Sequence, residues 1–337
     1  MNNLKFLILA LNIFFGAINS MAPKILQNTM PSAVWEIYSK NESIKKGDQS
    51  FINDCNKLSQ ENKKIPNAKG NIVRIATYNV HFWTDAQKNK NYDGILKIIL
   101  MINADILILQ EVLLFDQKRI EEDFQKMGYY VRKFCATQGR KFGNMILSRL
   151  PLTSKPIAKT FEIDKKSGGE QRCFINFKVQ LPNKEVVSVY GTHLDVYNGE
   201  SHRLAEINEL LKFTQLDKCK NIIIAGDFNS VRKKDYQYNV NGKLTWDLYC
   251  KTMEQLKKEK ISTETLDTIE KNGYQDCFSL ANISMPKFTC WTGTVIDFMF
   301  LSKYWTLPIK GCYTFYDCAS DHLPIIMDVE LKIKAKL

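Results

Sequence analysis

Short apolar runs that end in a polar residue recur along this 337-residue chain from residue 71 onward. Runs of about four to eight β-branched and aliphatic residues between polar or turn residues predict buried strands. Six segments carry an acid, an amide or an imidazole at such an end: 75–79, 106–111, 187–193, 222–229, 295–297 and 320–322. Six strands ending in this way predict one polar site at one rim of a sheet, an arrangement typical of a hydrolytic enzyme.

Amphipathic segments alternate with these strands and predict helices at 93–102, 116–127 and 201–216. In the last of them, apolar residues at 204, 207, 210 and 211 form a stripe that faces a core. A long polar section, 230–290, includes a further helix at 246–256. More strands are expected at 129–134, 144–148, 172–180, 186–192, 221–225, 295–301, 311–315 and 325–331. Mixed strands with helices outside them predict an α/β (α+β) fold of two packed sheets.

Residues 1–22 differ from the rest: a basic start with Lys5 precedes an apolar segment, 6–18, and small residues at 20 and 22. This layout predicts a signal peptide and therefore a secreted or exported protein. Two alternatives stay open, an uncleaved membrane anchor formed by 6–18 or translation from Met21, which would give a cytosolic protein. Residues 23–70 are polar, and we interpret them as an N-terminal extension and linker with one helix around 34–39. The domain itself spans 71–333.

Composition narrows the classes of partner. The formal net charge is +11, which favours a polyanion such as nucleic acid, an anionic lipid surface or a phosphorylated small molecule, although a lysine-rich codon bias would give the same charge. No obligate protein partner is predicted. The nine cysteines include no Cys-x-x-Cys pair, which argues against a zinc ribbon. Cys312 with Cys318, and Cys277 with Cys290, are candidate disulfides by closeness in sequence alone.

The candidate metal ligands are hard oxygen donors. Glu111 and Asp321 are carboxylates, and neither lies in a cluster of histidines or cysteines. Such donors favour Mg²⁺ over zinc, with Mn²⁺ or Ca²⁺ as substitutes. Asn79 can orient a ligand or hold a phosphate oxygen without adding charge. A site with few carboxylates and several neutral or cationic donors suits a phosphate ester, because the ester brings its own negative charge.

Catalytic candidates follow from the same rim. Asp227 can act as a general base toward water, and Asn229 can orient that water, with Gly226 allowing a sharp turn between strand and site. His193 and His322 can donate to an oxygen that gains negative charge in the reaction.

Supporting candidates complete the proposed site. Asp297 can hold one imidazole in a fixed tautomer, and Arg172 can contact phosphate through its planar fork. Asp105 and Asp195 are interpreted as capping or turn residues, and His202 as a surface residue at a helix start.

In this order, the motifs resemble the endonuclease/exonuclease/phosphatase superfamily, the deoxyribonuclease-I-like fold, over residues 71–331. They lie at 77–80, 110–112, 143–149, 192–195, 201–203, 226–229, 296–299 and 320–324. The resemblance implies a four-layer sandwich and Mg²⁺-dependent hydrolysis of a phosphate ester. It also implies roles: Glu111 as the principal metal ligand with Asn79 and Asp321 nearby, Asp227 with Asn229 as the water-activating base, and His322 oriented by Asp297. His193 matches a phosphate-contacting position, and Arg172 is a weaker match of that kind.

The substrate is less determined than the chemistry, because one fold hosts many substrates. A nuclease, and specifically an endonuclease acting on DNA or RNA, is the first expectation. Sphingomyelinase-like, inositol-phosphatase-like and tyrosyl-DNA phosphodiesterase-like activities are the alternatives, and a non-catalytic nucleic-acid-binding module is the least favoured one. A membrane-inserting segment at 288–291 would favour a lipid substrate, although packing of that segment against the core is the simpler interpretation.

Overall fold

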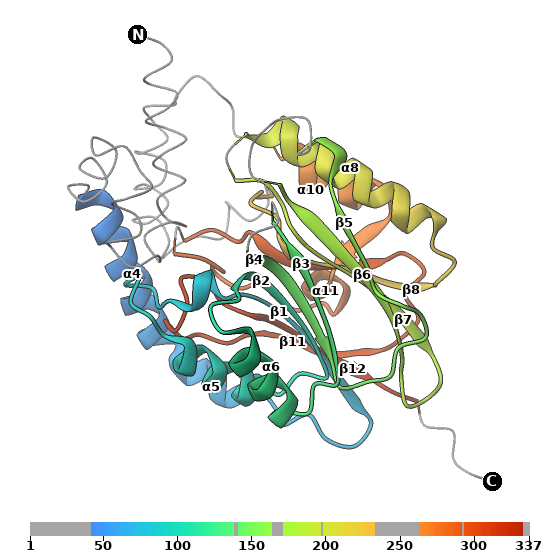
Figure 1. The fold of residues 1–337 in the computed structure, drawn as a ribbon, viewed down its shortest axis with the longest axis horizontal. Helices are drawn as coiled ribbons and strands as arrows, with labels where there is room; N and C mark the ends of the chain where they lie inside the picture. The colour runs from blue at the N-terminus through green and yellow to red at the C-terminus, as the bar shows by residue number, and fades with distance from the viewer. Residues whose placement is uncertain are drawn as a thin grey trace.

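The computed structural model describes residues 42–137, 141–163, 171–196, 198–232, 263–291 and 293–332. Two six-stranded sheets pack face to face, and helices cover their outer faces, so the domain has four layers (Figure 1). This confirms the expected deoxyribonuclease-I-like four-layer sandwich.

The first sheet has the strand order β11-β12-β1-β2-β4-β3. Its strands are β1 (Ile72–Asn79), β2 (Ile106–Leu113), β3 (Val131–Ala136), β4 (Phe142–Ser148), β11 (Ile309–Thr314) and β12 (Ile325–Glu330). The second sheet has the order β5-β6-β7-β8-β10-β9. Its strands are β5 (Ile157–Thr160), β6 (Cys173–Gln180), β7 (Val186–His193), β8 (Asn221–Asp227), β9 (Tyr274–Asp276) and β10 (Asp297–Ser302).

Each sheet contains one parallel pair, and a helix connects its two strands. Helix α5 (Tyr92–Ile102) links β1 to β2, and α8 (Glu200–Leu216) links β7 to β8. All other strand pairs are antiparallel, including the predicted β6–β7 hairpin. The remaining helices are α4 (Glu42–Leu58), α6 (Gln117–Lys126), α10 (Glu264–Lys271), α11 (Cys277–Leu280) and the short helices η1 (Ser59–Lys64) and η2 (His81–Trp83).

Burial on both faces explains why the strands are nearly continuous apolar runs. Between the sheets, side chains such as Ile108 and Ile175 form the central core. On the outer face of the first sheet, α5 and α6 contribute Ile99 and Phe124 to a second cluster, and α8 contributes Ile207 to a third cluster on the second sheet. The two sheets and the helices that cover them therefore form a packed core next to the rim where the strands end.

The described part of the N-terminal extension, from residue 42 onward, packs against the domain. Phe51 of α4 is buried, and its ring lies 5.6 Å from that of Phe288, edge to face. Asn62 in η1 donates to the carbonyl of Tyr316 and accepts from its N–H, both at 2.8 Å. The helix expected at 34–39 lies outside the described residues, as do 1–22 and the helix expected at 246–256.

Several details differ from the expectations. β8 continues through Gly226 to Asp227, and Asp297 begins β10 instead of ending a strand. The short strands β5 and β9 and the helices α4, α10 and α11 were not predicted. The eight cysteines of the described residues are free thiols, so neither suggested disulfide is present. Within the same residues, no helix is both long and apolar enough to cross a bilayer.

Candidate active site

Polar residues from both sheets meet at one rim because each strand that carries one of them either ends or begins at that rim. The parallel strands β1, β2, β7 and β8 end there, whereas the antiparallel strands β10 and β12 begin there. In the backbone register, Asp227 lies opposite both His193 and Asp297. The rim thus brings together the predicted residues Asn79, Glu111, Arg172, His193, Asp227, Asn229, Asp297, Asp321 and His322.

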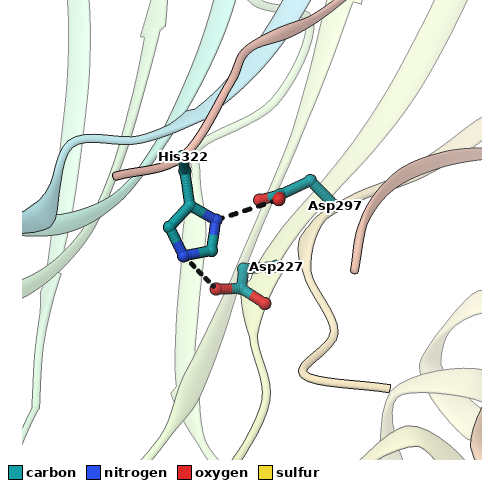
Figure 2. Close-up of side chains that lie close together, drawn as sticks. All are labelled: Asp227, Asp297 and His322. Atoms are coloured by element: carbon teal, nitrogen blue, oxygen red, sulfur yellow. Dashed lines mark hydrogen bonds and ion pairs between the residues drawn. The ribbon is translucent and has the colours of Figure 1, made fainter. Parts of the chain in front are cut away.

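Two carboxylates hold the imidazole of His322 between them (Figure 2). His322 Nδ1 lies 2.9 Å from Asp297 Oδ2, and its Nε2 lies 3.7 Å from Asp227 Oδ2. Burial alone would lower the pKa of His322, but Asp297 and then Asp227 raise it well above its usual value. The ring is therefore a cation at neutral pH. Its backbone is fixed by Ser320, whose hydroxyl donates to the carbonyl of Asn79 and accepts from the His322 N–H.

Asp227 is buried, and its carboxylate accepts from Asn79 Nδ2 at 3.0 Å and from the Asn229 N–H at 2.9 Å. Burial, with Asp297 next, raises the pKa of Asp227 to about 6. Its position depends on Gly226, which has a φ of 148° and where a Cβ would collide with the carbonyl oxygen of Thr192. Glycine is needed here for close approach of two strands, not for a turn. The chain turns three residues after Gly226, at Asn229, which has a φ of 46°.

Asn79 links the two sheets through its side chain. Its Nδ2 donates to Asp227 and, at 3.3 Å, to Glu111 Oε1, while its Oδ1 accepts from the backbone N–H of His81. All hydrogen-bonding atoms of the amide are therefore engaged in this structure. The geometry gives Asn79 an orienting role between the two carboxylates, and direct metal ligation by Asn79 stays a prediction.

Glu111 lies at an irregularity of β2, where the pairing with β4 shifts between Leu109 and Val112, and its φ is 55°. This conformation aims a buried carboxylate at the rim. Burial, followed by repulsion from Asp321, raises the pKa of Glu111 to about 8. Its Oε2 is buried and has no hydrogen-bond partner. A buried carboxylate oxygen without a partner is unfavourable unless a cation supplies the missing interaction.

Neighbouring cationic groups balance the charge of Asp321 more fully than that of Glu111. Its Oδ2 accepts from Lys88 Nζ at 2.8 Å, and its Oδ1 lies 3.3 Å from His81 Nδ1 without forming a hydrogen bond. Burial would raise the pKa of Asp321, but His81, Lys88 and His322 together lower it to about 2. Asp321 is therefore ionised at every physiological pH.

Two nitrogen donors face the ring of His193. Arg172 Nη1 lies 3.1 Å from Nδ1, and the amide nitrogen of Asn229 faces Nε2. A neutral imidazole accepts at only one nitrogen, so these two contacts do not fix its tautomer. Burial, then Arg172 and His322, lowers the pKa of His193 well below its usual value. Nε2 is 3.0 Å from Asn229 Nδ2 and 3.6 Å from Asp227 Oδ2. Arg172 thus lies behind the imidazole, and its own contact with phosphate stays a prediction.

A family model described as "Endonuclease/Exonuclease/phosphatase family" matches residues 76–322, most of the chain and nearly the whole described domain. The chain belongs to the endonuclease/exonuclease/phosphatase family. Members of this family are phosphoesterases and generally depend on a divalent metal, so the chain is assigned to the hydrolases. No curated protein sequence matches it significantly.

Solved structures of the family share the fold at low sequence identity. The human Nocturnin catalytic domain with bound sulfate is 19% identical, with a TM-score of 0.56 over 77% of this chain and 94% of that one. ANGEL2, a 2′,3′-cyclic phosphatase, is 18% identical, with a TM-score of 0.58 over 78% and 96%. Truncated Caenorhabditis elegans TDP2 is 17% identical, with a TM-score of 0.52 over 79% and 100%. At these identities the likeness establishes the fold alone.

The donor set of this family member fits a divalent cation that prefers oxygen. Glu111 Oε2 and Asp321 Oδ1 are buried oxygens without hydrogen-bond partners, and their two carboxylates repel one another. A second group, Asp227, Asp297 and His322, has ligand atoms within 4.8 Å of one another. His322 is protonated there, however, and a metal needs the neutral imidazole. The carboxylates of Glu111 and Asp321 are therefore the better candidate ligands.

Sequence reasoning missed His81 and Lys88. His81 begins η2, where three successive residues, His81, Phe82 and Trp83, have left-handed φ values of 41°, 57° and 64°. Each such residue costs about 1–2 kcal/mol, and strain of this kind concentrates at functional sites. His81 follows Asn79 by only two residues, which could have drawn attention to it. Nothing in the Lys- and Asn-rich segment around Lys88 distinguishes that lysine from its neighbours.

Residues assigned to structural roles lie outside the rim. Asp195 accepts from the N–H and the side chain of Asn198, three residues later, as expected of a turn residue. Asp105 instead accepts from the N–H of Arg74 in β1, 31 residues away, so it links two segments and is not a cap. The expectation for His202 is wrong, because its side chain is buried in α8 instead of lying on the surface.

Proposed function

We propose that this chain is a Mg²⁺-dependent phosphodiesterase and that its substrate is DNA or RNA, which it cleaves as an endonuclease. One observation carries the proposal: a raised-pKa carboxylate, a protonated imidazole and an uncompensated carboxylate lie within one buried rim. These are a proton acceptor, a donor for developing negative charge and a metal ligand, the groups that phosphate ester hydrolysis needs.

Asp227 is the base in this scheme. Water attacks phosphorus while Asp227 accepts its proton, the P–O bond to the leaving group breaks, and the leaving oxygen takes up a proton from solvent. A pKa of about 6 keeps the Asp227 carboxylate ionised yet basic near neutral pH. Asn229 follows Asp227 by two residues, and its side chain approaches His193, so its amide can orient the water or the phosphate. Asn79 keeps the Asp227 carboxylate in place through its 3.0 Å hydrogen bond.

The two imidazoles act on the phosphate as donors. His322 is held as a cation by Asp297 and can donate to an oxygen as negative charge grows on it. Burial and Arg172 favour the neutral form of His193, and its Nε2, which Asn229 Nδ2 faces at 3.0 Å, can donate to the phosphate once that amide turns toward the substrate. One charged and one neutral donor from different sheets can therefore contact the same phosphate group.

Glu111 and Asp321 are the residues that would hold Mg²⁺, with Mn²⁺ or Ca²⁺ as substitutes. When bound, the cation would neutralise phosphate charge and stabilise the transition state as a Lewis acid. For the protein, the consequence is that Glu111 becomes ionised and its Oε2 gains the partner that it lacks.

Two observations bear on the choice between a nucleic-acid and a lipid substrate. The net charge of +11 favours a polyanion, which includes nucleic acid and an anionic lipid surface alike. In addition, Phe288 of the segment considered for membrane insertion is buried at 4% exposure, between Phe51 and Tyr316. Among the similar structures, ANGEL2 is described as a 2′,3′-cyclic phosphatase, which is compatible with a nucleotide substrate for this chain.

A substrate panel tests the proposal. Plasmid DNA, single-stranded RNA, sphingomyelin, an inositol phosphate and a 5′-tyrosyl oligonucleotide are incubated with the protein, with and without Mg²⁺, beside the Asp227→Ala variant. We expect metal-dependent internal cleavage of nucleic acid that the variant lacks. Intact nucleic acid beside hydrolysis of the lipid, the inositol phosphate or the tyrosyl ester would keep the mechanism and overturn the substrate.

We also propose that residues 1–22 are a signal peptide and that the protein is exported. The basic start, the apolar segment and the small-residue pattern support this. N-terminal sequencing of the mature protein tests it: Pro23 is expected as the first residue. A mature chain that retains 1–22 would instead indicate an anchor, and one that begins at Met21 would indicate a cytosolic protein.

A further inference from the structure

The left-handed turn after β1 divides three neighbouring side chains among three environments. His81 is buried against Asp321, and Trp83 is buried in the outer core, where its Nε1 donates to the carbonyl of Leu113 at 2.8 Å. Phe82, between them, keeps part of its surface exposed. Hydrogen bonds from the Trp83 and Thr84 N–H groups to the carbonyls of Val80 and His81 hold the turn closed. The turn thus presents one aromatic ring outward while it anchors the residues on both sides.

Phe82 has a rigid support beneath it. Its ring is stacked on Phe142, with centroids 4.5 Å apart and planes only 12° apart. Phe142 is itself buried, at 6% exposure, and begins β4 beside Leu113 of β2. The next residue pair, Gly143 with Val112, is adjacent to Glu111. The stacked rings of Phe82 and Phe142 therefore lie on the same side of the rim as Glu111, the candidate metal ligand.

We propose that Phe82 is a specificity residue whose ring stacks on the nucleobase next to the scissile phosphate. This inference rests on the proposed nuclease function and adds a substrate class, nucleic acid whose bases are unstacked. A flat ring fixed parallel to a buried second ring suits a planar base, and every base has a face that can stack in this way. A quaternary ammonium of a lipid head group prefers a cage of several rings around it. The ring also lies near the candidate metal ligand Asp321, because His81, whose Nδ1 is 3.3 Å from Asp321 Oδ1, is adjacent to Phe82, with ring centroids 5.9 Å apart.

Kinetics on matched oligonucleotides test the assignment. Two single-stranded substrates contain one cleavable linkage each and differ only in whether the flanking nucleotides carry bases or are abasic. For the wild type, loss of the bases should raise KM about 10-fold, the size of one stacking interaction. With the base-containing substrate, the KM of Phe82→Ala should be about 10-fold higher than that of the wild type. With the abasic substrate, the KM values of the two proteins should be equal. Phe82→Trp should keep the wild-type KM on both substrates.

Two controls separate stacking from a structural role. Tyr304→Ala removes an exposed aromatic ring just after β10, at the end of that strand far from the rim, and should change neither substrate. Equal losses of Phe82→Ala on both substrates, or a change in kcat alone, would overturn the proposal and indicate a structural role for Phe82.

A binding measurement distinguishes this proposal from the proposed function. In an Asp227→Asn background, which blocks cleavage, fluorescence anisotropy should show about 10-fold weaker binding of the base-containing oligonucleotide by Phe82→Ala. Base-dependent binding without cleavage by the wild type would refute the nuclease and retain the stacking site. Cleavage of nucleic acid without base dependence would support the nuclease and refute the stacking site.

Discussion

The two sides of the active site differ in how their charges are balanced. On the imidazole side, which consists of Asp227, Asp297 and His322, a protonated ring lies between two carboxylates. On the carboxylate side, which consists of Glu111 and Asp321, Asp321 is paired with Lys88, whereas Glu111, whose pKa is raised to about 8, retains an oxygen without a partner. The protein thus preorganises the groups that handle protons and leaves one buried carboxyl group whose ionised form a bound cation would stabilise.

The largest expected effect comes from a substitution on the imidazole side of the site. Asp227→Asn removes the base but keeps the shape of the side chain, so kcat should fall by roughly 10²–10⁴-fold in steady-state cleavage assays with Mg²⁺. Mg²⁺ affinity should remain within a few-fold, because the cation lies on the other side. The control is Asp93→Asn, an exposed carboxylate paired only with Arg119 in α6, which should not change kcat. Equal losses of kcat and of Mg²⁺ affinity in Asp227→Asn would show that the two sides are not separate.

The second largest expected effect comes from a substitution on the carboxylate side of the site. Glu111→Gln removes the ligand charge, so we expect Mg²⁺ to bind at least about 10- to 100-fold more weakly in isothermal titration calorimetry, a loss typical of disrupted metal shells. The measurement needs no turnover. An unchanged affinity would assign the metal to another group, for which Asp227, Asp297 and His322 are the alternative.

The pH dependence of stability without metal sharpens the comparison. Glu111 has a folded pKa of about 8 against an ordinary 4.5, so its neutral form favours folding below about pH 4.5. That contribution is lost as the pH rises through about 8. Urea unfolding in EDTA should therefore show the free energy of unfolding of the wild type falling between about pH 5 and pH 8 by more than that of Glu111→Gln, by roughly 3–4 kcal/mol. Parallel curves for the two proteins would contradict the raised pKa.

The smallest effect has the opposite sign. Lys88→Met removes the cation 2.8 Å from Asp321 Oδ2, which leaves Asp321 more available to a metal. Mg²⁺ affinity should rise by about 2- to 10-fold, as expected for one nearby charge in a partly screened site. Lys88→Arg is the matched control and should bind Mg²⁺ like the wild type. A fall in affinity in Lys88→Met would mean that Lys88 positions Asp321 for the metal instead of competing with it.

Much of the fold and most of the site were predictable because they depend on local pattern. The apolar runs that lead to Asn79, Glu111 and His193 lie on strands that the pattern predicts almost to the residue. Asp227 was located correctly although β8 extends further than expected, since a glycine inside a strand resembles a strand end. Asp297 was also located correctly, yet it begins its strand, because sequence does not reveal strand direction.

Other features depend on contacts between distant segments. Helix α4 has a polar sequence, and its two buried residues Phe51 and Cys55 gain their partners from a loop over 200 residues away, which no local pattern records. β9 has only three residues, fewer than an alternation needs. The pairing of Lys88 with Asp321 likewise joins positions 233 residues apart.

The pairing of β1 with β12 has a consequence for synthesis of the protein. The strand that ends at Asn79 lies in the middle of its sheet, between β2 and the last strand of the chain. His322 comes just before that strand, so the imidazole cannot reach Asp227 until the chain has left the ribosome as far as residue 322. A shorter growing chain therefore has no complete site, and the proposed nuclease would remain inert beside the ribosome and message until that point.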